Sequence, residues 1–249
     1  MWRNRLPPDG AVLHRIDLSD RAIVFDIVAQ VRPEIILHAA YDMAAGGIPN
    51  TAWTTNVLDA AEATGVRFVF ISTDLVFGAT GAWHSELDHP NPTLAYGVWK
   101  STMERRVLDR GGIVVRTALV WGIDPIDKST QSLVLAPLRA GESPQLFEDE
   151  WRTPTEVHDL AEALIETFSI HGPRILHCAG PERLTRLQFG RMLARYFGFD
   201  PATIPASRRA NIAPDRPADT SLSCASSREF IKTRFRGPSE VLGVPAPPF

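Results

Sequence analysis

Tyr96 and Lys100 are the side chains in this sequence whose types and spacing point most directly to chemistry. They lie four residues apart on a segment expected to be helical, so the phenol and the ammonium can address one reacting atom. The alternative is a tyrosine at a helix start followed by a surface lysine. The chain has only three Tyr and three Lys, so random placement would give such a pair in roughly one chain in thirty.

Ser72 and Thr73 lie upstream of that pair, directly after a predicted strand. Residues 68–71 form an apolar and β-branched run, which is typical of a buried strand. The two hydroxyls follow at its carboxyl end, where open α/β sheets place their ligands. The constellation therefore combines hydroxyls, a phenol and an ammonium, and we expect no metal site.

Strands and helices alternate along the first half of the chain. Strands are expected at 12–16, 34–38, 68–71 and 113–116, with helices near 20–31, 49–63 and 96–110. This order predicts βαβ units, a parallel sheet and right-handed crossovers. Ser19 is the expected cap of the first helix, and Ile23, Val24, Ile27 and Val28 are its expected buried stripe.

Beyond Gly122 the alternation loosens. The pattern indicates helices near 130–139, 156–169, 185–196 and 226–233, and short strands near 145–147 and 174–177. We predict a Rossmann-like dinucleotide-binding domain over residues 1–122. Residues 123–249 are expected to form mainly a substrate-binding lobe, with some segments returning to the sheet.

The composition is that of a globular protein, with 44% hydrophobic and 22% charged residues in 249. A net charge of −3 gives no argument for a nucleic acid or an anionic membrane as partner. Cys178 and Cys224 fit neither a disulfide framework nor a zinc pattern. Without a signal peptide or a long apolar run, the expected location is cytoplasmic.

An ordered set of short motifs, running nearly end to end, resembles the extended short-chain dehydrogenase/reductases, in the branch typified by dTDP-4-dehydrorhamnose reductase. The resemblance implies an α/β fold: a Rossmann-like parallel sheet with helices on both faces, plus a small C-terminal α+β lobe that binds nucleotide-sugars. The matching residues are Asp17-Leu18, His38 to Tyr41, Asn56, Ser72-Thr73-Asp74, Glu86, Tyr96-Gly97 with Lys100, Val115-Arg116-Thr117, Arg152 to Thr155 and Arg216-Pro217.

The resemblance also implies an NADP(H)-dependent reductase of a nucleotide-linked 4-keto-sugar, with NAD as the alternative cofactor. Tyr96 would be the general acid in hydride transfer. Lys100, together with the oxidised cofactor, would lower the pKa of the phenol, and Lys100 would also hydrogen-bond the nicotinamide ribose. Thr73 would hold the substrate oxygen, with Ser72, otherwise a cofactor contact, as the fallback.

Further binding residues follow from the same resemblance. Asp17 and Leu18 would lie at the adenine, Ala39, Ala40 and Tyr41 along the middle of the cofactor, and Asn56 beneath them. Arg3 and Arg5 would favour NADP over NAD, the alternative being a basic loop. Arg152 and Arg216 would clamp the substrate diphosphate, the alternative being an ordinary surface salt bridge.

One departure concerns the glycine-rich turn, G-x-x-G-x-x-G, that receives the cofactor pyrophosphate. Gly46-Gly47 and Gly78 with Gly81 lie in the wrong context for it. By resemblance about 25–30 residues precede Met1 in the family. We interpret this as a misplaced start codon, the alternative being a degenerate, cofactor-poor variant. The chain from Met1 is expected to bind NADP(H) weakly or not at all, and to be only marginally stable or aggregation-prone.

Two classes of function follow. Thr73, Tyr96 and Lys100 favour the reductase. The missing glycine turn favours a non-catalytic nucleotide-sugar-binding or regulatory subunit of the same fold. The partner expected in either case is a nucleotide-sugar or similar small molecule, and the chain could form a homodimer.

Overall fold

A computed structural model of the chain describes residues 10–42, 47–78, 81–123 and 132–245. The predicted contacts of Arg3 and Arg5 and the turn at Gly46 lie outside these residues.

A parallel sheet of four strands, in the order β1-β2-β3-β8, forms the centre of the described chain. Its strands are β1 (Ile35–His38), β2 (Arg67–Thr73), β3 (Ile113–Thr117) and β8 (Ile175–His177). All three pairings are parallel, with Leu37 opposite Val69, Phe70 opposite Val114 and Val115 opposite Leu176. The strands predicted at 34–38, 68–71, 113–116 and 174–177 are therefore confirmed, and β8 returns to the sheet from the second half of the chain.

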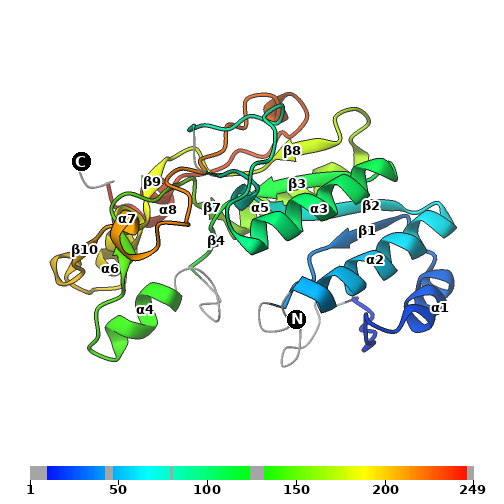
Figure 1. Cartoon of the computed structure of the whole chain (residues 1–249), viewed down its shortest axis with the longest axis horizontal. Helices are drawn as coiled ribbons and strands as arrows, with labels where there is room; N and C mark the ends of the chain where they lie inside the picture. Colours follow the sequence, from blue (N-terminus) through cyan, green and yellow to red (C-terminus); the bar gives the residue numbers. More distant parts are fainter. Residues whose placement is uncertain (1–9, 43–46, 79–80, 124–131, 246–249) are drawn as a thin grey trace.

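Helices cover both faces of this sheet (Figure 1). Because side chains alternate along a strand, Phe68 and Phe70 face one layer and Val69 faces the other. The first layer consists of α1 (Arg21–Val31), α2 (Gly47–Thr64) and α3 (Ala95–Asp109), and α5 (Val157–Glu166) covers the opposite face. This arrangement confirms the predicted Rossmann-like α/β fold.

The strand predicted at residues 12–16 is wrong. Within the described residues β1 is an edge strand and no strand lies beside residues 12–16, so their backbone has no ladder to join. Val12 and Leu13 are 79% and 54% exposed, and Leu37 on β1 is 37% exposed. Apolar side chains are thus exposed to solvent along this edge of the sheet.

The start of α1 also differs from expectation. The carboxylate of Asp20, not the Ser19 hydroxyl, caps the helix by accepting the N–H groups of Ala22 and Ile23. Ser19 instead donates its N–H and its hydroxyl to the carboxylate of Asp17. The buried stripe is narrower than predicted: Val24 and Val28 are buried, whereas Ile23 is 41% exposed.

Most of the remaining elements, among them α4, α6, α7 and α8, gather beside the carboxyl ends of the sheet strands, at the left of Figure 1. Trp121 and residues of α6 and α4 share one apolar core there. The predicted last helix near 226–233 is only the short 3₁₀ turn η4 (Ser227–Glu229), in which the carboxylate of Glu86 accepts the N–H and the hydroxyl of Ser227. The bounds are β4 Val120–Trp121, α4 Ser132–Arg139, β5 Leu146–Phe147, β6 Trp151–Arg152, β7 Thr155–Glu156, β9 Leu184–Thr185, α6 Arg186–Tyr196, β10 Ala206–Ser207, α7 Arg209–Ile212 and α8 Pro238–Leu242, with 3₁₀ turns η1 Asp74–Val76, η2 Thr167–Ser169 and η3 Pro201–Thr203.

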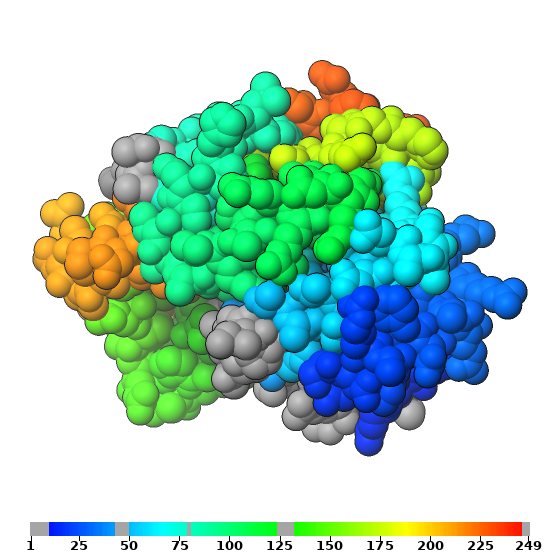
Figure 2. Space-filling model, turned by 45° about the vertical axis from the view of Figure 1, so that its right-hand side comes forward, coloured from blue at the N-terminus to red at the C-terminus, as the bar shows by residue number. Residues whose placement is uncertain are grey.

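The surface in Figure 2 shows α2 and α3 side by side across the face that lies over Phe70, with α1 at its lower right. Among the described helices, none has both the length and the apolar character needed to cross a bilayer.

Candidate active site

A cavity of about 250 Å³ lies where β1, β2 and β3 end. Ala39 and Tyr41, which follow β1, form part of its wall, and Leu119 and Val120 form another part after β3. Its polar lining consists of Ser72, Thr73, Tyr96, Lys100 and Thr117. The structure thus brings the predicted hydroxyls, phenol and ammonium together at the carboxyl edge of the sheet, as expected for a parallel α/β fold.

Helix α3 presents Tyr96 and Lys100 to this cavity because it packs directly on the η1 turn after β2. A Cβ atom at Gly97 would lie 2.0 Å from the carbonyl oxygen of Leu75, so only glycine permits this approach. Thr73 caps η1 by accepting the Leu75 N–H at 3.2 Å, and its own hydroxyl donates to Asp74 at 3.1 Å. The same short turn therefore fixes Thr73 and the start of α3.

Lys100 is buried, with only 5% of its surface exposed. Its Nζ donates a 2.6 Å hydrogen bond to the carbonyl of Ile71 and lies 4.4 Å from the centre of the Phe70 ring. Burial lowers the pKa of Lys100 to about 7, although the negative charge of Glu104 acts in the opposite direction. The ammonium is therefore ready to lose its charge near neutral pH.

Tyr96 has a pKa above the ordinary value of a phenol. Burial is the largest cause, followed by Tyr41 and Asp74, whereas Arg152 and a hydrogen bond with Thr73 lower the pKa. Lys100 is not among the groups that lower this pKa, and its Nζ lies 6.0 Å from the ring centre. A joint effect of Lys100 and the oxidised cofactor on the phenol stays a prediction. The phenol consequently keeps its proton at neutral pH, which is the state that a general acid requires.

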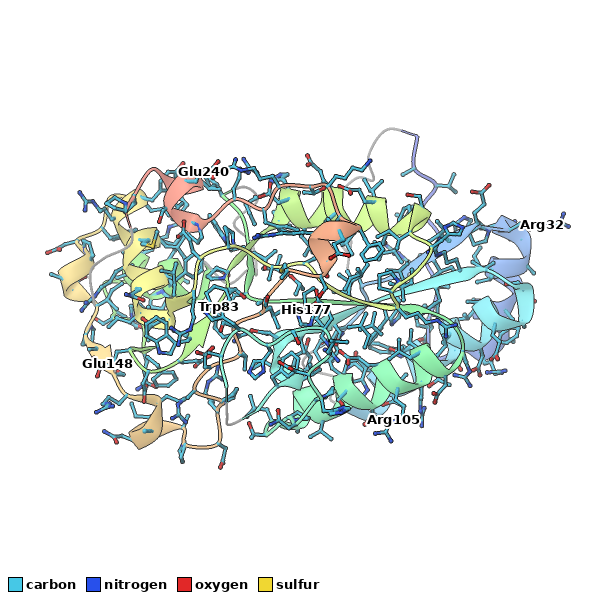
Figure 3. All side chains as sticks on the ribbon, turned by 90° about the horizontal axis from the view of Figure 1, so that it is seen from above. Arg32, Trp83, Arg105, Glu148, His177 and Glu240 are labelled. Carbon is cyan, nitrogen blue, oxygen red and sulfur yellow. The ribbon has the colours of Figure 1, made fainter. Side chains whose placement is uncertain are left out.

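A buried ion pair lies behind Ser72. The Ser72 hydroxyl donates to Glu104, and Glu104 accepts a 2.8 Å hydrogen bond from Arg116, both being at most 2% exposed. The Arg116 Nη1 lies 3.4 Å from the Nε2 of His177, which Figure 3 shows in the interior of the molecule. Burial lowers the pKa of His177 to about 4. Glu104 was not among the residues predicted from the sequence, although it lies four residues after Lys100 and so shares its helix face.

The residues predicted to hold the adenine lie on a separate loop before α1. The Nδ2 of Asn56, on α2, donates to the carbonyls of Leu18 and Ser19 at 2.9 and 3.2 Å. Asp17 is exposed, and its carboxylate accepts hydrogen bonds from Ser19. Asn56 therefore fixes this loop, but neither Asp17 nor Leu18 lines the cavity.

The middle of the predicted cofactor path is closer to the phenol. Ala39 and Ala40 directly follow β1, and the ring of Tyr41 lies 5.0 Å from that of Tyr96 in an edge-to-face contact. In this lining Ala39 provides a small apolar wall, and Thr73 and Lys100 provide hydrogen-bond donors that face it. This lining suits a planar ring joined to a ribose, which is the nicotinamide half of a dinucleotide.

The two predicted substrate arginines do not line this cavity. Arg152 is 4% exposed, and its Nε and Nη2 both donate to the carboxylate of Asp74. Arg216 donates to Glu150 at 2.9 and 2.8 Å and lines a second cavity of about 270 Å³ together with Arg209. Binding of a diphosphate by Arg152 or Arg216 stays a prediction.

The pKa of Lys100 predicts a pH-dependent stability. Between about pH 7 and about pH 10 the unfolded chain holds the lysine proton while the folded chain has lost it, so stability rises with pH over this range. We expect Lys100→Met to flatten that rise, which urea unfolding at several pH values would measure. Lys232→Met, at an exposed lysine, is the matched control. Parallel stability curves for all three proteins would contradict the lowered pKa.

An open parallel sheet covered by helices, with a tyrosine and a lysine four residues apart at the strand ends, defines an extended short-chain dehydrogenase/reductase. The chain belongs to the family described as RmlD substrate binding domain, which matches residues 9–238.

Curated relatives with similar sequences are named either as reductases or as a subunit of methionine adenosyltransferase. The chain is 28% identical over 232 residues to the probable low-salt glycan biosynthesis reductase Agl14 of Haloferax volcanii, covering 87% of this chain and 77% of that one. It is 28% identical over 239 residues to dTDP-4-keto-6-deoxy-D-glucose reductase of Streptomyces niveus, covering 90% and 82%. It is also 25% identical over 232 residues to methionine adenosyltransferase 2 subunit beta of Bos taurus, covering 85% and 69%.

Solved structures agree on the fold. The dTDP-4-dehydrorhamnose reductase of Bacillus anthracis, determined in complex with NADP, superposes with a TM-score of 0.76 at 22% identity. The superposition covers 91% of this chain and 84% of that one.

Proposed function

We propose that this protein is an NADP(H)-dependent reductase of a nucleotide-linked 4-keto-sugar. The observation that carries the proposal is the phenol of Tyr96, which has a raised pKa and shares one cavity with Thr73 and Lys100. The names of the Haloferax and Streptomyces relatives support a reductase, and the second supports a nucleotide-linked keto-sugar as substrate. The NADP in the Bacillus anthracis structure supports NADP(H) as the cofactor.

Tyr96 would hold the transferred proton on its phenolic oxygen and give it to the carbonyl oxygen of the sugar. Its raised pKa keeps this proton in place until negative charge develops on that oxygen. Thr73, which hydrogen-bonds the phenol, would orient the same carbonyl oxygen. When bound, a nicotinamide dinucleotide supplies the hydride in this kind of reaction.

Lys100 would act beside the phenol rather than on the substrate. Its Nζ is fixed by the carbonyl of Ile71 and lies among aromatic rings. Further donors on the ammonium can reach ribose hydroxyls at the cavity. A bound polar ligand would also restore solvation to the ammonium, raising its pKa and strengthening its charge near Tyr96. The charge of Lys100, and its effect on Tyr96, would therefore depend on the same bound ligand.

The test is a reductase assay on dTDP-4-keto-6-deoxyglucose with NADPH and with NADH, following oxidation of the nucleotide. The protein is produced both from Met1 and with any in-frame upstream codons of its gene. We expect turnover with NADPH, and a lower kcat/KM with NADH. NADPH binding without any turnover on this and related nucleotide-linked keto-sugars would contradict the proposal.

The second candidate function is a non-catalytic regulatory subunit. It is favoured by the match to a protein named as a subunit of methionine adenosyltransferase, which covers 85% of this chain. A protein of this kind would bind a nucleotide ligand without consuming it. Stoichiometric binding of NADPH that leaves the nucleotide unoxidised, together with a partner enzyme whose rate changes on addition of this chain, would select this candidate.

A further inference from the structure

A second concave site lies at the outer edge of β8, the edge of the sheet opposite β1. Among the described residues β8 is the last strand of the sheet, and it lies at the upper edge in Figure 1. Beside it is a groove of about 400 Å³, larger than the cavity that contains Tyr96 and Lys100. The reductase mechanism above uses no part of this groove.

The floor of the groove offers backbone groups without partners. The carbonyl of Arg174 accepts the N–H of Val114 at 2.8 Å, so Arg174 turns its backbone towards β3. Successive residues of a strand turn their backbone groups to opposite sides, so Ile175 and His177 face outwards. The His177 N–H donates to the hydroxyl of Ser227 at 2.7 Å. The N–H and the C=O of Ile175 have no hydrogen-bond partner within the described chain. An edge strand in this state can accept a further strand.

Apolar side chains form the walls of the groove. Leu87, on the loop before α3, is 87% exposed, and Phe230, directly after η4, is also exposed. The half-buried side chains of Leu108 and Ile175 pack against the same apolar core and continue the lining. Exposed apolar side chains that gather at a groove, rather than lying singly on the surface, mark a binding site.

Arg174 supplies a positive charge at the rim of the groove. Its side chain is exposed, and its Nη1 donates to the carbonyl of Leu108 at 3.1 Å. No ion pair of Arg174 with a carboxylate occurs among the described residues. The acidic residue of the lining, Glu86, is engaged elsewhere, because its Oε1 accepts the N–H and the hydroxyl of Ser227 and its Oε2 is buried. The free donors of Arg174 therefore favour an acidic group on a partner.

We propose that this groove binds an extended peptide segment of a partner protein, which adds a strand to the outer edge of β8 and carries an acidic residue beside apolar ones. One residue of the segment would exchange two backbone hydrogen bonds with Ile175, as in an antiparallel pair. Its side chain would lie on the same face as that of Ile175, next to Leu108. The unpaired backbone groups favour a peptide because each peptide residue carries a matching donor and acceptor. The site is independent of the proposed reductase activity.

Binding of a designed probe tests the proposal. The probe is the fluorescein-labelled peptide Gly-Val-Leu-Val-Asp-Gly, measured by fluorescence anisotropy. In one control peptide Lys replaces Asp, and in the other the backbone nitrogens of the three apolar residues are methylated. We expect the probe to bind with a Kd below about 1 mM. Methylation should weaken binding at least about tenfold, and the lysine peptide should bind about three- to tenfold more weakly.

Substitutions at exposed positions of the protein complete the test. Leu87→Ser should weaken probe binding about tenfold. Ile165→Ser is the matched control, because Ile165 is 63% exposed on α5 and lies outside the groove lining. Arg174→Glu should reverse the preference, so that the lysine peptide binds more tightly than the probe. A thermal melt should place each variant within a few degrees of the wild type.

Absence of probe binding at about 1 mM, or equal binding of the methylated peptide, would overturn the addition of a strand at β8. An unchanged preference in Arg174→Glu would refute the acidic residue of the partner. Displacement of the probe by an equal concentration of decanoate would instead make the groove a site for small amphiphiles. A wild-type dimer that Leu87→Ser dissociates, measured by sedimentation velocity, would make the occupant a second copy of this chain. Either of these last two results also overturns the proposal.

Discussion

Tyr96→Phe is expected to lower turnover at least about 100-fold while changing the Kd for NADPH little. The substitution removes only the phenolic proton, and general acid catalysis contributes about 10²–10⁴-fold. The phenylalanine ring would keep the edge-to-face contact with Tyr41 and the packing near Trp99. Steady-state rates with a keto-sugar nucleotide, together with a cofactor titration, measure both quantities.

Tyr196→Phe provides the matched control, because Tyr196 is 41% exposed at the end of α6 and lies outside the cavity. Its turnover should equal that of the wild type. Removing the buried phenol hydroxyl also removes one hydrogen-bond partner of Thr73, so the Tyr96→Phe protein should first be shown to melt within a few degrees of the wild type. A well-folded Tyr96→Phe protein with near-normal turnover would refute the assignment of Tyr96 as the acid.

Patterns within short segments predicted the sheet and the approach of Tyr96 to Thr73. The run of apolar residues at 68–71 predicts a buried strand, which finds ladder partners in β1 and β3, and hydroxyls directly after it must appear at the carboxyl edge. The strand predicted at 12–16 depended instead on a neighbour that the described residues do not supply. A short apolar segment therefore specifies a potential strand, whereas the ladder partner decides whether it forms.

The electrostatics of the site were less predictable because they depend on partners far apart in the sequence. Asp74 and Arg152 are separated by 78 positions, and Glu104 and Arg116 belong to different elements. The pKa of Tyr96 depends mainly on burial, which spacing along one helix does not reveal. The family resemblance placed Arg152 near a diphosphate, but it could not show that its guanidinium is already paired with the carboxylate of Asp74. Spacing along one helix therefore predicts that Tyr96 and Lys100 share a face, whereas the packing of residues distant in the sequence determines their pKa values.

Arg152→Met is expected to destabilise the protein by about 3–5 kcal/mol, because it leaves the fully buried carboxylate of Asp74 without its cation. The Thr220 hydroxyl, at 2.9 Å from Asp74, would remain as a hydrogen-bond donor but carries no charge. A loss of this size is comparable to a large part of the 5–15 kcal/mol typical of a domain. Urea unfolding of the two proteins measures the difference.

The double variant Asp74→Asn with Arg152→Met separates the ion pair from a role in substrate binding. It removes both charges, so most of the lost stability should return, since breaking a buried pair costs more than replacing it. If Arg152 also binds the substrate diphosphate, the double variant should regain stability while its KM stays raised. Near-wild-type stability of Arg152→Met alone would show that Asp74 does not need this cation. The arginine would then be free for the phosphate contact that its sequence motif predicts.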